Sequence, residues 1–222
     1  YSAAPLTDED KTKIDTLLVG RGLHCEFGFE PVNLNTGNFY LNTSDVTLQE
    51  PSGAFQIGRS YNSKTASQYS SFGRGWGFTY DESLALCQDG SLAYRRGDGS
   101  TVYFSPDGSG GFLSPQGLYL SLAKIPAGQK TVNFGTEEDP DIKTVEIIEY
   151  EITDANKTVK RFNAGGQLLF IRDQNGFKTE FAYDAQKLLS KITTPSGKEL
   201  IVHENPNGTI AQIDLPNGAS LS

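Results

Sequence analysis

The stretch AYDAQKLLSKITTPSG, residues 182–197, is one of three segments with the same length and pattern. RFNAGGQLLFIRDQNG (residues 161–176) precedes it and HENPNGTIAQIDLPNG (residues 203–218) follows it, so the segments recur at intervals of 21 residues. Equivalent positions form three columns and a final turn glycine: Phe162, Tyr183 and Glu204; Leu168, Leu189 and Ile210; Ile171, Ile192 and Ile213; Gly176, Gly197 and Gly218. A fixed period with fixed apolar columns indicates stacked supersecondary units.

Each unit is too short for a pair of helices. It has room for one strand, a tight turn, a second strand and a glycine turn, so we predict that each unit is a β-hairpin. The leucine and isoleucine columns lie three residues apart, which places them on opposite faces of a regular strand. Either the second strand of each unit carries a bulge, or both of its faces are partly buried.

The rest of the chain also favours β structure, apart from one segment near the N-terminus. Residues 7–19 predict a helix, because Thr7 can cap it and acidic residues follow the cap. The apolar stripe of this helix consists of Ile14, Leu17 and Leu18. Beyond Gly22 apolar residues recur at every second position, and the turn GDGS at residues 97–100 predicts a hairpin. The predicted fold is all-β, with antiparallel hairpin units that stack into a spiral sheet and one short N-terminal helix.

Composition and charge disfavour some classes of function. The formal net charge is -8 at pH 7, so the surface repels phosphate backbones and nucleic-acid binding is not expected. No run approaches the roughly 18 apolar residues of a membrane span. The chain begins with Tyr1 and ends in LPNGASLS, where a new strand would begin, so we expect a processed protein or a piece of a longer one.

The two cysteines, Cys25 and Cys87, have no close partner cysteine or histidine, so no metal site is predicted. Two alternatives remain open for them. They are two buried thiols, or they form a disulfide that stabilises the fold by about 4 kcal/mol through loop closure. The even count and the expected export make the Cys25–Cys87 disulfide the hypothesis to test. No cofactor is expected.

The only tryptophan lies in the glycine-rich stretch FGRGWGF. A phosphate-binding loop would open a helix, but the residues after Gly77 have an extended pattern. A nucleophile elbow would need a serine between the glycines, where this chain has Arg74 and Trp76. We therefore predict a packing role, in which Gly73, Gly75 and Gly77 allow close approach or positive φ and Trp76 is buried.

No catalytic site is predicted, and the chain is not expected to be an enzyme. His24 and His203 are the only histidines, and there is no serine or cysteine motif with which they could pair. The segment GTEEDPD, residues 135–141, lacks the alternating oxygen ligands of a calcium loop and predicts a solvated acidic turn. Carboxylates are abundant, but no spacing indicates a glycosidase pair.

The unit that contains the intact pair Tyr183–Asp184 resembles the YD repeat of RHS proteins, and its neighbours have Phe162–Asn163 and Glu204–Asn205 at that place. Four upstream blocks are similar to the domain that precedes the repeats in many bacterial RHS and wall-associated proteins. In the order of that family they are PVNLNTGNFYL (residues 31–41), RSYNS (59–63), FGRGWGFTYDESL (72–84) and YRRGDGSTVYF (94–104). The resemblance covers residues 31–222.

The resemblance implies a spiral β-sheet that closes into a hollow shell around a variable C-terminal effector, often a toxin. This chain would then be the non-catalytic N-terminal start or plug of such a shell. Its partners would be further YD repeats and the effector of its own parent chain. The alternative is a cell-surface adhesion module that recognises a carbohydrate or another protein. Both functions imply a secreted or bacterial cell-surface location.

The expected domains are a helical lead (residues 1–24), a β-rich domain (25–135) and YD-type repeats (136–222). Each repeat buries its face against the next one. We therefore expect the last unit to expose Ile210 and Ile213 and to be the least stable part of the chain, with an edge that frays or self-associates.

Overall fold

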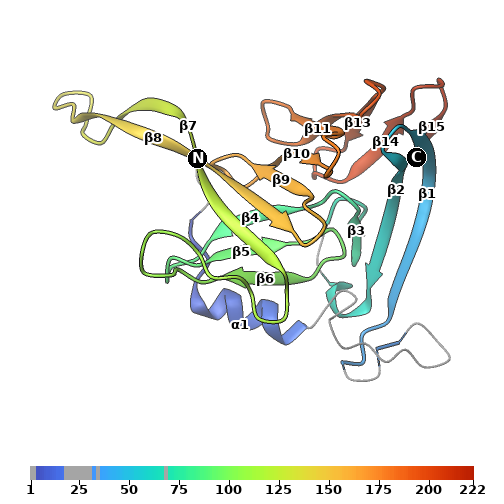
Figure 1. The fold of residues 1–222 in the computed structure, drawn as a ribbon, viewed down its shortest axis with the longest axis horizontal. Coiled ribbons are helices and arrows are strands. Elements are labelled where there is room, and N and C mark those ends of the chain that lie inside the picture. Colours follow the sequence, from blue (N-terminus) through green and yellow to red (C-terminus); the bar gives the residue numbers. More distant parts are fainter. Residues whose placement is uncertain (1–3, 18–31, 34–35, 68–69) are drawn as a thin grey trace.

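The computed structural model describes residues 4–17, 32–33, 36–67 and 70–222. This part of the chain is mostly antiparallel β-sheet, with one short α-helix (Figure 1). Its strands form two three-stranded sheets and one nine-stranded sheet. The predicted all-β fold with one short N-terminal helix is confirmed.

The helix α1 spans Asp8–Leu17, within the range predicted from its cap and acidic first turn. Thr7 and Asp10 cap it reciprocally. The Asp10 backbone N–H donates to Thr7 Oγ1 at 3.1 Å, and the Thr7 backbone N–H donates to the Asp10 carboxylate at 3.0 Å. This capping box satisfies backbone donors that have no partner inside the helix.

The two small sheets follow α1 in the chain. Their strands are β1 (Tyr40–Glu50), β2 (Gly53–Asn62) and β3 (Trp76–Phe78) in the first sheet, and β4 (Ser83–Leu86), β5 (Leu92–Arg95) and β6 (Thr101–Phe104) in the second, with the 3-10 helix η1 (Ser63–Thr65) after β2. Both hairpins of the second sheet use the same turn, in which Gly90 and Gly99 have φ values of 81° and 85°. The hairpin predicted from GDGS is therefore the pair β5–β6.

The nine-stranded sheet runs in sequential order from β7 to β15. Its strands are β7 (Leu120–Asn133), β8 (Ile142–Asp154), β9 (Val159–Phe162), β10 (Leu168–Arg172), β11 (Lys178–Tyr183), β12 (Leu189–Thr193), β13 (Glu199–Glu204), β14 (Ile210–Asp214) and β15 (Ser220–Leu221). The three repeat units form the hairpins β9–β10, β11–β12 and β13–β14, as predicted. Gly176, Gly197 and Gly218 lie in the turns that follow them, with φ between 81° and 89°.

A β-bulge recurs at the same place in every unit. In the first hairpin Leu168 pairs with β9, but the next paired residue is Phe170, which leaves Leu169 outside the ladder. Ser190 and Ala211 are the equivalent residues in the next two hairpins. Because of the extra residue, the isoleucine column points to the same face as the leucine column, although the two are three residues apart. Both columns therefore pack on the core. Of the two alternatives for these columns, the bulge is confirmed.

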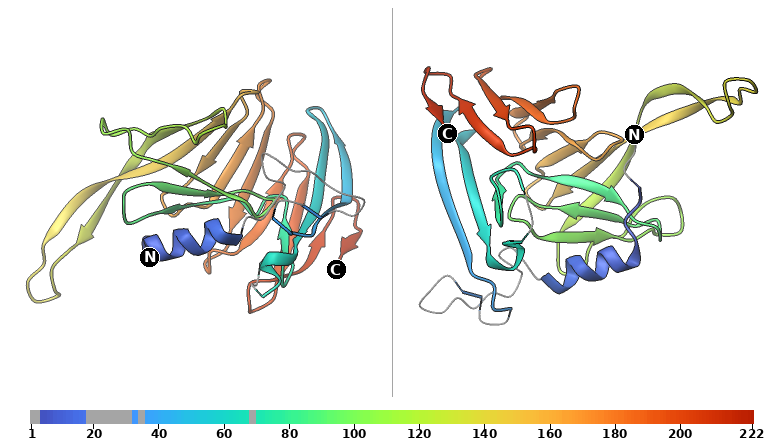
Figure 2. Two further views of the ribbon diagram at one scale, coloured as in Figure 1. Left: turned by 90° about the horizontal axis from the view of Figure 1, so that it is seen from below. Right: turned by 180° about the vertical axis from the view of Figure 1, so that it is seen from behind.

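All three sheets contribute side chains to one hydrophobic core. Figure 2 shows how the strands of the three sheets are arranged around it. The nine-stranded sheet contributes Leu122, Ile152, Phe162, Leu168, Phe181, Ile192, Leu200, Val202 and Ile213, and the small sheets contribute Phe55, Ile57, Phe78, Leu84, Leu92, Tyr94 and Phe104. The repeats therefore bury their inner face against β1–β6 and not only against one another. We call this contact the docking interface.

The predicted exposure of the last unit is wrong. Ile213 is 1% exposed, and Ile210 is only partly exposed. Phe72 borders a small cavity together with both isoleucines, and the Ile210 backbone N–H donates to the Ser71 carbonyl at 2.6 Å. The inner face of the last unit is covered by the segment before β3, so its burial does not depend on a following unit. Whether this unit is the least stable part remains a prediction.

Strands β7 and β8 extend beyond the body as a long two-stranded hairpin (Figures 1 and 2). A register shift between Pro126 and Gln129 interrupts it. A proline and a bulge in an edge strand hinder pairing with a further strand. The predicted acidic segment, residues 135–141, is the exposed turn of this hairpin. The predicted domain boundary at residue 135 falls in the same turn, and the sheet that carries the repeats already begins at Leu120.

Gly166 marks a close backbone approach between the repeats and the small sheets. The Leu84 backbone N–H donates to the Gly166 carbonyl at 2.9 Å. A β-carbon on Gly166, whose φ is +84°, would overlap the Leu84 carbonyl oxygen. Gly176 has a similar φ of +89°, but a β-carbon there would meet no atom within 4 Å. Gly176 is therefore a matched control for Gly166.

We expect Gly166→Ala to lower the free energy of unfolding more than Gly176→Ala. Each substitution places an alanine in the left-handed region, which costs about 1–2 kcal/mol. Gly166→Ala also separates the backbone from Leu84, which should cost about 2 kcal/mol more. Urea unfolding of the two variants measures the difference, and equal losses would contradict a close approach at Gly166.

Candidate functional site

The described residues contain no group of three or more His, Cys, Asp or Glu side chains that could hold a metal ion. In the same residues no helix has the length and apolar character needed to cross a membrane. His24 lies outside the described residues. His203 Nε2 lies 2.7 Å from Asp214 Oδ2 on neighbouring strands, and both side chains are exposed. The docking interface buries the carboxylate side chains of Glu50 and Glu82, so we take it as the candidate functional site.

A buried ionic cluster crosses the docking interface. Glu82 precedes β4, and its side chain is only 8% exposed. Lys160 of β9 places its Nζ atom 2.7 and 2.8 Å from the two Glu82 carboxylate oxygens. Tyr94 of β5 donates its hydroxyl to Glu82 at 2.5 Å, and its ring packs edge-to-face against Phe162. The two charges neutralise each other and are hydrogen-bonded, which is the condition for keeping them in apolar surroundings.

The Tyr94 hydroxyl keeps its proton in this cluster. Burial raises the pKa of Tyr94, and the negative charge of Glu82 raises it further. Tyr94 therefore remains a hydrogen-bond donor at neutral pH and cannot act as a base. The cluster is suited to attaching β9 to the second small sheet and not to proton transfer.

A second polar contact joins the tip of the β1–β2 hairpin to the turn after β12. The Glu50 side chain is 0% exposed, and it accepts the Ser196 backbone N–H and the Lys198 Nζ at 3.0 Å each. Burial opposes the ionised form of Glu50, but hydrogen bonds from Ser196 and Lys198 outweigh it and lower the pKa of this carboxyl. Glu50 therefore stays charged and fixes the hairpin tip on the repeats.

Aromatic rings connect the same two parts through the core. Tyr80, between β3 and β4, stacks on Phe55 with ring centroids 5.5 Å apart. The same ring lies 5.2 Å from Phe181 of β11. Aromatic pairs at such distances stabilise a fold beyond the area that they bury. Tyr80 thus links β2 directly to the middle repeat.

We expect Lys160→Met to lower the free energy of unfolding by about 3 kcal/mol, because it leaves the Glu82 charge buried without its cation. Adding Glu82→Gln removes that charge and should recover at least half of the loss. A double-mutant cycle measured by urea unfolding gives the coupling between the two side chains. Strictly additive losses would show that the pair does not couple the two sheets.

A cavity of about 210 Å³ lies beside the ionic cluster at the docking interface. Its carboxylates are Asp81, Glu82 and Glu204. Glu82 is paired with Lys160, and Asp81 lies 3.5 Å from Arg95. Burial raises the pKa of Glu204, and the charges of Asp184 and Asp81 raise it further. Two of the three carboxylates, Asp81 and Glu82, are therefore paired with cations, whereas Glu204 is the one whose pKa is raised.

The three glycines of the stretch FGRGWGF have the backbone geometry that the sequence predicts. Gly73 and Gly75 have φ values of +97° and +75°. A β-carbon on Gly75 would lie 2.8 Å from the Tyr61 ring, and one on Gly77 would lie 3.2 Å from Ser60 Oγ. Positive φ and close neighbours both favour glycine at these positions. The stretch continues into β3, so it opens a strand and not a helix.

Trp76 is only partly buried, which corrects the prediction that it is buried. Its ring lies 5.2 Å from the Tyr61 ring, and the Arg59 guanidinium lies 5.3 Å from its centroid. Arg59 in turn makes two hydrogen bonds to Asp45, at 2.6 and 2.7 Å. Trp76 therefore packs on a neighbouring strand and under a cation, and it is not part of the shared core.

We expect Trp76→Ala to lower the free energy of unfolding by about 2 kcal/mol, less than the 3–5 kcal/mol that is typical of a fully buried aromatic side chain. The partly exposed indole should also be quenched by acrylamide in the folded protein, at a rate between those of buried and free tryptophan. Equilibrium unfolding and quenching measure these two results. A loss above about 4 kcal/mol together with no quenching would indicate full burial.

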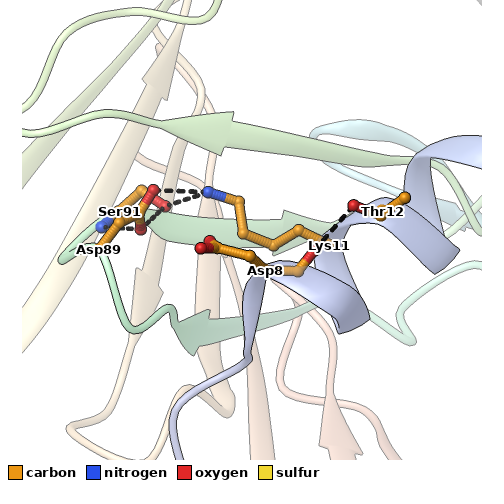
Figure 3. A network of polar contacts seen from close by, with 5 residues as sticks. All are labelled: Asp8, Lys11, Thr12, Asp89 and Ser91. Carbon is orange, nitrogen blue, oxygen red and sulfur yellow. Dashed lines mark hydrogen bonds and ion pairs between the residues drawn. The ribbon is translucent and has the colours of Figure 1, made fainter.

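Lys11 attaches α1 to the second small sheet (Figure 3). Its Nζ lies 2.7 Å from Asp89 Oδ2 and 3.1 Å from Ser91 Oγ, and Ser91 donates its hydroxyl to Asp89 at 2.6 Å. A serine–lysine catalytic pair would need a neutral lysine and an accessible serine. The hydrogen bond to Asp89 raises the pKa of Lys11, and Ser91 is 1% exposed. The contact therefore attaches the helix and does not activate a nucleophile.

Cys87 is a buried free thiol in the structure. Cys25 lies outside the described residues. The hypothesis of a Cys25–Cys87 disulfide therefore stays a prediction, as does the alternative of two buried thiols. Titration of thiols in unfolded, unreduced protein distinguishes the two alternatives.

The Tyr183–Asp184 pair has a structural role in the middle unit. The Tyr183 hydroxyl donates to the Leu168 carbonyl of the preceding unit at 2.9 Å. Asp184 Oδ1 accepts the Leu188 backbone N–H at 2.9 Å within the hairpin turn. Tyr183 thus joins successive units, and Asp184 stabilises the turn that follows it.

The polar residues of the docking interface were not predicted from the sequence. They are Glu50, Glu82, Lys160, Lys198 and Glu204. Only Glu204 carried a signal, because it occupies a column that is aromatic in the other two units. The other four occupy none of the repeat columns in the sequence, and their partners are far away along the chain.

Comparison with known families finds a match for part of the chain. Residues 29–104 match the family described as domain of unknown function (DUF6531). The matched range contains all six strands of the two small sheets and ends with β6 at Phe104, before the nine-stranded sheet. It covers about a third of the chain. None of the curated proteins matches the chain.

Proposed function

We propose that this chain is a non-catalytic part of an RHS-type protein, in which β1–β6 start and plug a shell of YD repeats. The observation that carries this proposal is the shared core, in which the small sheets cover the inner face of the repeat sheet. Domains of the matched family are commonly found in RHS and YD-repeat proteins, which supports the same assignment. The role of β1–β6 would be to cover an apolar face that water would otherwise reach.

The geometry of the repeats supports growth into a curved sheet. Each unit adds one hairpin with its bulge at the same position, at Leu169, Ser190 and Ala211. A bulge bends its strand and increases the local twist. Because the bend recurs with every unit, further units would continue the curvature in one direction, as a spiral shell requires.

The proposed partners follow from this role. Further YD repeats of the parent chain would pair with β15, the last strand of the sheet. The enclosed partner would be the parent's C-terminal effector, and the protein would be secreted or displayed on a bacterial cell surface. A net charge of -8 argues against nucleic acid as a partner.

The alternative is a cell-surface binding module for a carbohydrate or a protein. Sugar binding by stacking would need exposed aromatic side chains that lie together. Tyr119 and Phe134 are the most exposed large aromatic residues of the described chain, at 86% and 61%. The aromatic rings of the inner face are buried in the core. The shell proposal therefore has the stronger support, and binding on a glycan array would favour the alternative.

We expect the sheet to lengthen when more repeats are supplied. Two further copies of Phe181–Ile201 appended after Ser222 continue the register of the columns. Hydrogen exchange in Ser220–Leu221 should slow, because β15 gains a partner strand, and the appended units should become protected. A shuffled sequence of the same composition is the control. Appended units that exchange as fast as an unfolded peptide would contradict the proposal.

A further inference from the structure

Glu204 occupies a position that is aromatic in the other two units. In the middle unit the Tyr183 hydroxyl at this position donates to a backbone carbonyl. In the last unit the Glu204 Oε2 atom is buried and has no hydrogen-bond partner among the described residues. A buried acceptor that carries charge and lacks a donor destabilises the arrangement around it. Glu204 therefore contributes differently to the docking interface in its two protonation states.

The surroundings of Glu204 are mostly negative. It borders the cavity of about 210 Å³ at the docking interface. The titratable groups that line this cavity or act on Glu204 are Tyr80, Asp81 and Glu82 from the segment before β4, and Tyr183, Asp184 and Lys187 from the middle unit. Glu82 is paired with Lys160 at 2.7 Å, whereas the contact between Asp81 and Arg95 is longer, at 3.5 Å, and the charge of Asp81 still acts on Glu204.

We propose that Glu204 makes the docking interface sensitive to pH. The protonated side chain holds β1–β6 and the last repeat together, and the ionised side chain loosens them. Protonation removes the repulsion from Asp81 and Asp184 and turns one carboxyl oxygen into a hydrogen-bond donor. The pH dependence of the interface is argued from Glu204 and its neighbours alone. Its consequence for a shell of repeats rests on the proposed function.

The sign of the effect follows from the direction of the pKa shift. Burial is the main cause that raises the pKa of Glu204 in the docked state, and together with the charges of Asp184 and Asp81 it outweighs the hydrogen bond from the Leu189 backbone N–H, which lowers this pKa. The docked state therefore binds the proton more tightly than the loosened state does, and it is favoured at low pH. This advantage is fully present below the ordinary glutamate pKa of about 4.3 and is lost as pH rises through the higher pKa of the docked state. Each unit of difference between the two pKa values changes the docking equilibrium by about tenfold.

Two backbone amides report on the interface itself. The Leu84 N–H donates to Gly166, and the Ile210 N–H donates to Ser71, so each hydrogen bond joins the small sheets or their loops to the repeats. We expect their protection factors, corrected for the intrinsic pH dependence of exchange, to fall in the native chain as pH rises above about 4.3, the ordinary pKa of glutamate. The fall should be about tenfold for each unit of pKa difference. In Glu204→Gln the same protection factors should not change with pH.

Three further variants keep the test sharp. Glu204→Tyr restores the residue type of the middle unit and should also abolish the pH dependence, so it serves if Glu204→Gln folds poorly. Asp184→Asn removes a like charge and should lower the pH of the midpoint. Glu50→Gln is the matched control, because the pKa of this buried carboxyl is lowered and not raised. It should weaken docking at neutral pH and leave the pH-dependent fall in protection intact.

Carbon-13 NMR of the Glu204 carboxyl group in the native chain gives its pKa directly. A value above that of an exposed glutamate supports the proposal, and a value at or below it overturns it. Protection factors that fall equally in the native chain and in Glu204→Gln also overturn it. Neither result affects the shell proposal, which the appended repeats test independently.

Discussion

The structure depends on the need to cover the inner face of the nine-stranded sheet. Every repeat presents its leucine and isoleucine columns on this face, and the side chains of β1–β6 complete the core. Each small sheet has only three strands, which is the lower limit for a sheet that is stable on its own, and each places its apolar side chains in the shared core. The region that matches a known family and the repeats that follow it are therefore parts of one core.

Apolar burial is not directional, so it does not by itself determine the orientation of the small sheets relative to the repeats. The polar contacts supply that orientation. Glu82 and Lys160 meet in the interior, and Glu50 holds the turn around Ser196. The approach of Leu84 to Gly166 adds a backbone contact that tolerates no side chain. These contacts lie on different strands, and together they allow one arrangement.

The repeats are regular where they build the sheet and irregular where they meet the small sheets. Turn glycines and bulges recur in every unit, because each hairpin needs the same local geometry. Glu204 departs from the aromatic column at the place where the last unit borders the interface cavity. A position that breaks a local rule without a local reason is where a functional constraint is expected.

The sequence by itself determined the capped helix, the hairpin units, their turns and the need for a bulge. These features depend on residues that are neighbours along the chain, such as Thr7 and Asp10, and on a period that is repeated three times. Only the tertiary structure decided that Ile213 is covered, that Trp76 is only partly buried and that ion pairs cross the docking interface. Lys160 and Glu82 are 78 residues apart, and Ser196 and Glu50 are 146 residues apart. No local pattern records such pairs, because their energy arises only when packing removes both partners from water.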